Sequence, residues 1–363
     1  MDDDQSDRLL GVGILGAAVI AKKVVRGIKV STAPLEVVAV GSRSIEKAEA
    51  FIQETGITTE AKPYGSYQEV LDDERVDIIY MPLPSSMHLE WVKKAAAQKK
   101  HVVCEKPLAR TSKEADQMIA ACQKAGVQFM DGTMWMHNPR TTAMMAKLQD
   151  ENVMGKLRTV ISTFSALGNE EFFAKDIRVQ SDLDPLGALG DLGWYCVRAC
   201  LWAFDFAPPL SVTAHPGSIR NEQKVLMHVG ATILFDENRR AVLNCGFDEA
   251  LNQVVQVSGT TGLLRMYDFV IPREEDSAEF RVTLNPGFAD GDTAVVGPTD
   301  RHSVKLDRPQ ESYMWETFAR CVEQIKDGRS PAPSWPAMAA LTQRIVSAID
   351  ESDQAGCKTI QLR

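Results

Sequence analysis

The sequence predicts a two-domain α/β protein, in which a parallel α/β domain precedes a sheet-rich α+β domain. A chain of 363 residues is long enough for two hydrophobic cores. Up to about residue 135, short apolar runs alternate with amphipathic stretches, which is typical of βαβ units. After Pro139, strand-like runs separated by turn residues dominate, as expected of an antiparallel or mixed sheet.

The first half contains the strands and helices expected of a parallel sheet. The helix Ser112–Ala125 is predicted because Ala115, Met118, Ile119 and Cys122 recur at helical spacing. The expected strands are, in order, Leu10–Leu15, Glu36–Val40, Val76–Met81, Val102–Cys104 and Val127–Met130.

The second half is expected to form a sheet closed by two late helices, Gln310–Lys326 and Trp335–Ser352. Its expected strands are Leu157–Phe164, Ser211–Ala214, Val225–Phe235, Arg240–Phe247, Val254–Ser258, Leu263–Ile271 and Phe280–Leu284. We place the domain boundary after His137, which gives domains of residues 1–137 and 138–363, and the last helix can pack back on the first domain.

Composition argues against several classes of function. A formal net charge of −9 disfavours nucleic acid as the main partner. No uncharged apolar run approaches the roughly 18 residues that a membrane helix needs, and Met1-Asp2-Asp3-Asp4 has the wrong charge for a targeting peptide. Seven cysteines without a C-x-x-C pair indicate reduced thiols, so we expect a cytoplasmic protein. Cys196 and Cys200 lie one helical turn apart without further ligands at zinc-like spacing, so no metal site is expected.

A glycine turn after the first strand predicts a dinucleotide site. Gly11–Gly16 matches G-x-G-x-x-G, but this match lies inside the strand, whereas the motif must follow a strand and open a helix. We therefore place the phosphate turn at Gly16–Ala21, with small alanines where the fingerprint has glycines. The expected cofactor contacts here are Gly16, Ala17, Ala18, Val19 and Ile20.

The end of the second strand indicates which dinucleotide binds. Glu36 begins that strand, whereas the group that meets the adenosine ribose must lie at its far end. The far end carries Ser42 and Arg43, a hydroxyl and a planar cation suited to the 2'-phosphate of NADP. We therefore expect NADP(H) to be preferred over NAD(H).

Four motifs occur in order along the chain. Glu105-Lys106-Pro107 follows the apolar run Val102–Cys104, at the rim where open α/β sheets bind ligands. With Pro82–His88, Met130–Thr141 and Gly187–Tyr195, this tripeptide resembles the Gfo/Idh/MocA oxidoreductase family over nearly the whole chain. The similarity is closest to a plant branch of that family, and more distant to dimeric dihydrodiol dehydrogenases and NADP-dependent D-xylose dehydrogenases.

The resemblance implies a doubly wound Rossmann domain followed by a large, open, mostly antiparallel sheet that forms a homodimer. It also implies hydride transfer between a nicotinamide and a carbinol or carbonyl carbon in the interdomain cleft. The further cofactor-binding residues that it implies are Leu83, Pro84, Ser85, His88, Glu105, Lys106, Pro107 and Trp135.

By the family pattern, Lys106 hydrogen-bonds the reacting oxygen. The D-x-G-x-H motif appears as Asp191-Leu192-Gly193-Trp194-Tyr195, so a tyrosine stands where many relatives have histidine. Asp191 and Tyr195, at i and i+4, share one helix face. We assign Tyr195 as acid/base, with Lys106 favouring its phenolate and Asp191 orienting substrate or lysine. If Tyr195 is structural, Lys106 becomes the direct proton donor.

Other polar and aromatic residues are candidates for substrate contact, each with a structural alternative. His88 either contacts a ligand or caps a helix, and Arg178 either binds substrate or pairs with Asp176. The tryptophans of the motifs line an apolar pocket, stack on a sugar or pack in the core. The substrate residues are, together, Lys106, Trp135, His137, Asn138, Arg140, Arg178, Asp191, Trp194 and Tyr195.

Three functions remain open from the sequence. The first is an NADP-dependent oxidoreductase that acts on a sugar, a sugar conjugate or a cyclic diol. The second is a catalytically silent NADP-binding regulatory protein, which would need none of Lys106, Asp191 and Tyr195. The third is an enzyme that acts on an apolar specialised metabolite, either an enone or a trans-dihydrodiol.

Overall fold

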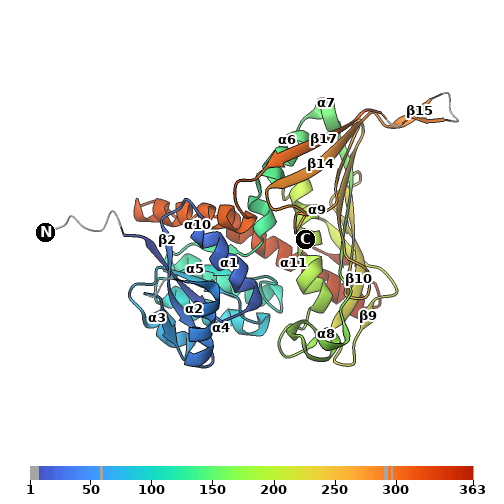
Figure 1. Cartoon of the computed structure of the whole chain (residues 1–363). Helices are drawn as coiled ribbons and strands as arrows, with labels where there is room; N and C mark the ends of the chain where they lie inside the picture. Colours follow the sequence, from blue (N-terminus) through green and yellow to red (C-terminus); the bar gives the residue numbers. More distant parts are fainter. Residues whose placement is uncertain (1–7, 58–59, 290–292, 296, 363) are drawn as a thin grey trace. The chain divides into compact units, whose positions relative to one another are not determined.

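The computed structural model describes residues 8–57, 60–289, 293–295 and 297–362. The chain divides into two compact units (Figure 1). Unit 1 contains the residues up to His137 together with Arg308–Ala340, and unit 2 contains Asn138–Asp307 and Leu341–Arg363. Among the described helices, none has both the length and the apolar character needed to cross a membrane.

Unit 1 is built on a six-stranded sheet in the order β3-β2-β1-β4-β5-β6, with every neighbouring pair parallel. This order confirms the predicted doubly wound Rossmann domain, in which ligands bind beyond the carboxyl ends of the strands. The strands are β1 (Leu10–Leu15), β2 (Leu35–Gly41), β3 (Lys62–Tyr64), β4 (Ile78–Met81), β5 (His101–Cys104) and β6 (Phe129–Asp131).

The helices of unit 1 connect these strands and include one helix from the end of the chain. The predicted helix α5 is capped by Thr111, whose hydroxyl accepts a 3.2 Å hydrogen bond from the amide of Glu114. The helices are α1 (Val19–Lys29), α2 (Ile45–Thr55), α3 (Tyr67–Asp72), α4 (Ser85–Ala97), α5 (Ser112–Ala125), a 3₁₀ turn (Met134–His137) and α10 (Gln310–Lys326).

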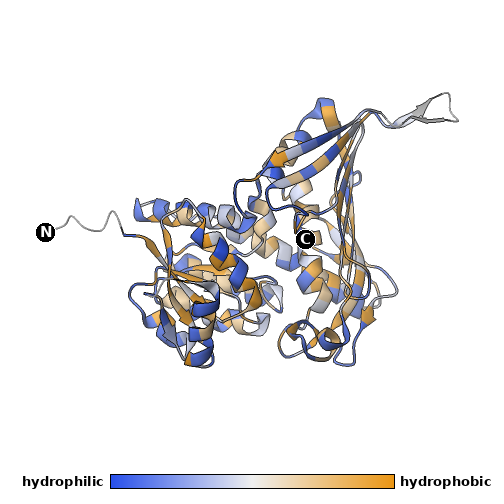
Figure 2. Cartoon of the chain, in the orientation of Figure 1, coloured by the Kyte–Doolittle hydropathy of each residue, from blue (hydrophilic) through white to orange (hydrophobic). Residues whose placement is uncertain are grey.

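The core of unit 1 lies on both faces of its sheet. Every residue of β1 and β4 is buried, and Figure 2 shows the central strands mostly in the hydrophobic colour. Strands covered by helices on both faces read as continuous apolar runs, which is why the sequence predicts them well. The exception is β3, whose three residues include a lysine and a proline.

Unit 2 is built on a ten-stranded sheet in the order β17-β14-β13-β12-β7-β11-β10-β8-β18, with β9 beside β10. Among the strands that the structure describes in this sheet, only β7 and β11 pair in parallel, so the predicted mostly antiparallel sheet is confirmed. The strands are β7 (Leu157–Ser165), β8 (Ser211–Ala214), β9 (Ile219–Arg220), β10 (Leu226–Leu234), β11 (Arg240–Gly246), β12 (Asn252–Gly259), β13 (Gly262–Met266), β14 (Ser277–Leu284), β17 (Thr299–Lys305) and β18 (Ile360–Gln361). A separate pair is formed by β15 (Gly287–Ala289) and β16 (Thr293–Val295).

One face of the large sheet is covered by helix α9, which packs on β7, β11 and β12. Along β7, Val160 and Phe164 are buried while Ile161 is exposed, so the side chains alternate between a covered and an open face. Helix α11 (Ser334–Gln354) begins in unit 1 and belongs to unit 2 from Leu341 onward. The other helical segments of unit 2 are α6 (Pro139–Leu148), α7 (Glu151–Met154), α8 (Glu170–Lys175), a 3₁₀ turn (Ile177–Val179), a π-helix (Leu189–Gly193) and α9 (Trp194–Ala203).

Candidate active site

The turn between β1 and α1 is shaped for a phosphate group. Gly16 has a φ of +118°, which a residue with a side chain rarely adopts, and its amide donates a 2.9 Å hydrogen bond to the carbonyl of Gly41. Ala18 is the N-cap of α1, and alanine offers no side-chain oxygen to the helix amides. The start of α1 is therefore not capped by the side chain of its N-cap residue, and this turn fits a dinucleotide pyrophosphate.

The far end of β2 carries the predicted ribose-binding pair. Ser42 is buried, and its amide donates a 3.1 Å hydrogen bond to the carbonyl of Tyr64, whereas the side chain of Arg43 is exposed. Burial raises the pKa of the Tyr67 phenol, and the Arg43 guanidinium opposes that rise. Glu36 lies at the opposite end of the strand, in register with Gly11, as the sequence predicts.

His88 is held by two backbone carbonyls, and its expected contact with the cofactor stays a prediction. The imidazole is buried in the first turn of α4, and its two nitrogens lie 2.9 Å from the carbonyl oxygen of Leu108 and 2.8 Å from that of Leu83. It therefore ties the loop after β4 to the segment that follows Lys106. Ser85, in the same turn of α4, is also buried.

The residues Glu105, Lys106 and Pro107 directly follow β5, as the sequence predicts. The Glu105 carboxylate is buried and accepts a 2.7 Å hydrogen bond from the hydroxyl of Tyr80 and a 3.3 Å hydrogen bond from the amide of Lys106. Burial raises the pKa of Glu105, while the Tyr80 hydrogen bond and the nearby Lys106 charge oppose the rise. A Cβ at Gly132 would lie 2.8 Å from the same carboxylate, so only glycine fits there.

Tyr80 is a site residue that the sequence analysis missed. It lies within an apolar strand, and its register partner Val103 precedes Glu105 by two residues. A buried tyrosine hydroxyl requires a hydrogen-bond partner, and this requirement is the signal that could have identified the pair.

The 3₁₀ turn Met134–His137, which ends the first stretch of unit 1, packs against other residues of the protein. Trp135 is buried within its 3₁₀ turn, which favours the core-packing alternative for this ring. The His137 imidazole stacks on the ring of Trp335 at 4.6 Å, with 28° between the ring planes.

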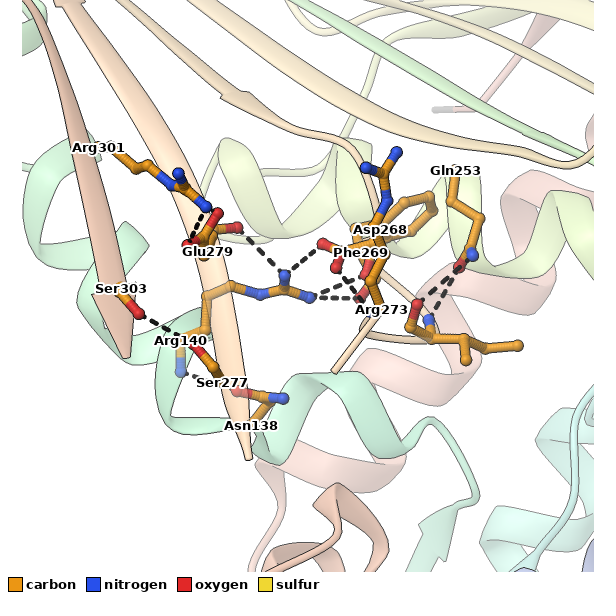
Figure 3. A network of polar contacts seen from close by, with 11 residues as sticks. Asn138, Arg140, Gln253, Asp268, Phe269, Arg273, Ser277, Glu279, Arg301 and Ser303 are labelled. Atoms are coloured by element: carbon orange, nitrogen blue, oxygen red, sulfur yellow. Dashed lines mark hydrogen bonds and ion pairs between the residues drawn. The ribbon is translucent and has the colours of Figure 1, made fainter. Parts of the chain in front are cut away.

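In unit 2, two further candidates for substrate contact are held by protein groups (Figure 3). The Asn138 side chain caps α6 by accepting a 2.9 Å hydrogen bond from the amide of Arg140. The Arg140 side chain is 1% exposed, and it donates to Asp268 Oδ1 at 2.5 Å and to the carbonyls of Glu279 and Phe269. Burial lowers the pKa of Arg140 and Asp268 opposes this. These contacts hold Asn138 and Arg140 within unit 2, and their expected contact with a substrate stays a prediction.

Asp191 lies in a π-helix that continues directly into α9. In an α-helix, four residues overshoot a full turn by about 40°. A π-turn takes more residues per turn, so it reduces the overshoot and brings Asp191 and Tyr195 closer to one line along the helix. A Cβ at Gly193 would lie 2.9 Å from the sulfur of Cys245 on β11, so this glycine lets the turn pack closely on the sheet. Single π-turns are frequent at functional sites.

The Arg178 guanidinium forms ion pairs with Asp176 and with Asp191. Asp191, which the sequence places in a catalytic pair with Tyr195, therefore already has a cationic partner. The Arg178 Nε lies 2.9 Å from Asp191 Oδ2, and its Nη1 lies 3.1 Å from Asp176 Oδ1. The charge of Asp191 raises the pKa of the guanidinium, with Asp176 adding to the effect. The alternative of a pair with Asp176 is confirmed, and the partner Asp191 is an addition.

Tyr195 lies in the first turn of α9, beneath the sheet. Its ring centre is 5.9 Å from that of Phe164 on β7, and the side chain is nearly buried. The ring of Trp194 is fully buried and lies 5.6 Å from the guanidinium carbon of Arg198, which favours packing over a substrate contact.

A doubly wound sheet with a glycine turn before α1 defines the first unit as a dinucleotide-binding domain of the Rossmann class. Two family models support this class. A model described as an oxidoreductase family with an NAD-binding Rossmann fold matches residues 10–133, and one described as a Gfo/Idh/MocA C-terminal domain matches residues 142–265. The chain belongs to the Gfo/Idh/MocA oxidoreductase family.

Relatives with named activities match over much of the chain. A D-xylose 1-dehydrogenase (NADP(+)) of Haloferax volcanii is 30% identical over 351 residues, which cover 95% of this chain and 97% of that protein. A trans-1,2-dihydrobenzene-1,2-diol dehydrogenase of Danio rerio is 30% identical over 231 residues, 64% of this chain and 66% of that protein. The similarity to both kinds of enzyme is thus confirmed, whereas the similarity to a plant branch stays a prediction.

A solved structure of similar fold carries a nicotinamide cofactor. It is a 3-ketoreductase from Actinomadura kijaniata, crystallised in complex with NADP and TDP-benzene. The two chains are 25% identical, with a TM-score of 0.79, over 95% of this chain and 98% of that one.

Proposed function

We propose that the protein transfers a hydride between NADP(H) and a carbinol or carbonyl carbon of a sugar, a sugar conjugate or a cyclic diol. The observation that supports this most is the position of Lys106, directly after β5 and beside the buried Glu105. The relatives named for xylose and for a dihydrodiol support this range of substrates.

Bound NADP supplies the carbon that accepts or donates the hydride, and the chain supplies position and proton transfer. The α1 amides and the Gly16 turn would hold the pyrophosphate. Lys106 donates a hydrogen bond to the reacting oxygen, and Tyr195 carries the proton. Asp191, paired with Arg178, orients the substrate.

The test is NADP+ reduction by the purified protein across aldoses, polyols, glycosides and cyclic trans-diols. Turnover of at least one of these compounds is the expected result, and it would fix the reaction and the substrate class together. Tight NADPH binding without turnover of any compound would contradict the proposal and favour a silent NADP-binding protein.

We propose that Arg43 sets the preference for NADP(H), and Arg43→Asp is expected to reverse it. The exposed guanidinium would pair with the 2'-phosphate, whereas an aspartate repels that group and accepts from a ribose hydroxyl. Fluorescence titration should show a loss of NADPH affinity of at least about tenfold, since one charge-assisted contact is worth about 1.5–3 kcal/mol, with NADH affinity retained. Equal losses for both dinucleotides would show that Arg43 does not read the phosphate.

We propose a homodimer formed through the open face of the unit 2 sheet. Ile161 and its register partner Val242 point to the face opposite α9, and Ile161 is exposed although apolar. Paired apolar positions on an uncovered sheet face are typical of an interface. Light scattering should therefore give twice the chain mass, and Ile161→Asp should give the mass of one chain. A wild-type mass equal to one chain would contradict this expectation.

We also expect the protein to act in the cytoplasm with a small-molecule substrate. All seven cysteines are free thiols, and six of them are buried. Reduced thiols are typical of a reducing compartment.

A further inference from the structure

A hollow of about 510 Å³ lies in the segment of unit 2 that precedes Arg178. The segment runs from the end of β7 through the short helix α8 to the 3₁₀ turn at Ile177–Val179. The hollow is lined by Leu167, Gly168, Asn169, Glu171, Phe172, Lys175 and Asp176. Its volume is in the range of small-molecule sites, which is about 300–1,000 Å³.

The walls of the hollow are braced by contacts to the sheet. The Phe172 ring packs edge-on against Phe247 at 4.9 Å, and the amide of Gly168 donates a 2.8 Å hydrogen bond to the Phe247 carbonyl. A Cβ at Gly168 would lie 2.6 Å from the Phe172 ring, so this close arrangement requires glycine. The hollow is therefore a built feature of unit 2.

Large apolar side chains are exposed in this segment and beside the end of β7, where the segment begins. Leu167 is 70% exposed and Phe173 is 42% exposed, although both belong to the same short segment. Leu251, 68% exposed, follows Ala250, whose carbonyl accepts a 2.7 Å hydrogen bond from the hydroxyl of Ser165. Clustered exposed apolar groups rimmed by polar ones mark ligand-binding surfaces.

The polar lining of the hollow favours an uncharged, hydroxyl-bearing ligand. Glu171 and Asp176 are hydrogen-bond acceptors with negative charge, and Lys175 is the only cation among the lining residues. Carboxylates accept hydrogen bonds from hydroxyl groups and repel phosphates and carboxylates. An aromatic wall beside them suits the C–H face of a sugar ring.

Asp176 connects the hollow to the candidate catalytic residues. Its carboxylate faces Arg178 at 3.1 Å, and the same guanidinium holds Asp191 at 2.9 Å. A ligand hydroxyl that bonds Asp176 therefore lies one side chain, that of Arg178, away from Asp191.

We propose that the hollow is a substrate subsite for the part of the molecule that does not react, and that this part is a sugar ring bearing an apolar substituent. The carboxylates bind the hydroxyl groups, the exposed apolar rim covers the substituent, and Arg178 is the positioning residue between subsite and Asp191. The inference rests on the proposed function for the identity of the substrate as a sugar conjugate.

The test compares phenyl and methyl β-glycosides of glucose, galactose and xylose by isothermal titration calorimetry, since each pair differs only in its apolar part. At least one phenyl glycoside should bind about tenfold more tightly than its methyl counterpart, as expected from partial burial of the ring. Leu167→Ser combined with Leu251→Ser should abolish this difference. Leu9→Ser, which changes an exposed leucine of unit 1, should preserve it.

Two results would overturn the subsite: equal affinity within all three pairs, or a phenyl advantage that survives in the double serine variant. Binding is measured without turnover, so the subsite and the proposed function can fail separately. A protein that prefers phenyl glycosides but oxidises no compound of the substrate panel would keep the subsite and lose the proposed function.

Discussion

Lys106→Ala is expected to lower kcat/KM for a turned-over substrate by about 10²–10⁴-fold, the usual contribution of a positioned acid or base. The alanine removes the ammonium that hydrogen-bonds the reacting oxygen, while the phosphate turn at Gly16 is untouched. NADPH affinity should therefore change little, and the measurement is steady-state NADP+ reduction beside a fluorescence titration of NADPH.

The matched control is Lys113→Ala, which removes an exposed lysine from α5 in the same unit. This control variant should retain wild-type turnover. If Lys106→Ala also retains it, the assignment of Lys106 is wrong. A loss of NADPH binding as large as the loss of turnover would instead place the lysine in cofactor binding.

Arg140→Met is expected to lower the free energy of unfolding by about 3–5 kcal/mol, because it leaves the carboxylate of Asp268 without its buried cation. The carbonyls of Glu279 and Phe269 also lose a donor. Adding Asp268→Asn should recover part of the loss, since asparagine is uncharged and can still accept from the amide of Arg273.

Urea denaturation measures this effect, with Arg239→Met as the control. Arg239 pairs with Asp236 in the same unit, but both side chains are at least one-third exposed. Exposed pairs contribute about 0–1 kcal/mol, so the control should lose far less stability. Equal losses of unfolding free energy in the two variants would show that the buried network around Arg140 contributes no more to stability than an exposed ion pair.

The sequence predicts helices and strands correctly where burial produces a regular pattern of apolar residues. Leu10–Leu15 forms β1, and Ser112–Ala125 forms α5, because a strand buried on both faces is continuously apolar and a one-sided helix has an apolar stripe. The strand β17, Thr299–Lys305, was missed since it lies at the edge of its sheet and exposes most of its polar side chains.

The motifs locate the candidate residues along the chain, but they do not indicate which protein groups each side chain contacts. His88 and Arg140 belong to the motifs, yet both are turned towards backbone carbonyls or a buried carboxylate. The partner of Arg140 is Asp268, 128 residues further along the chain, and no local spacing indicates such a pair. The hollow before Arg178 was missed because its ring contact to Phe247 is likewise formed by distant residues.

Because of the π-helix at Leu189–Gly193, the number of residues in this segment determines how the side chains of the candidate site are oriented. A π-turn behaves as an α-helix that carries one additional residue. Loss of Leu192 would leave Asp191, Gly193 and Tyr195 in the sequence and still change the rotational phase between Asp191 and Tyr195 by about 100°. Two relatives with the same acid and the same tyrosine can therefore differ in activity through one gap in their alignment.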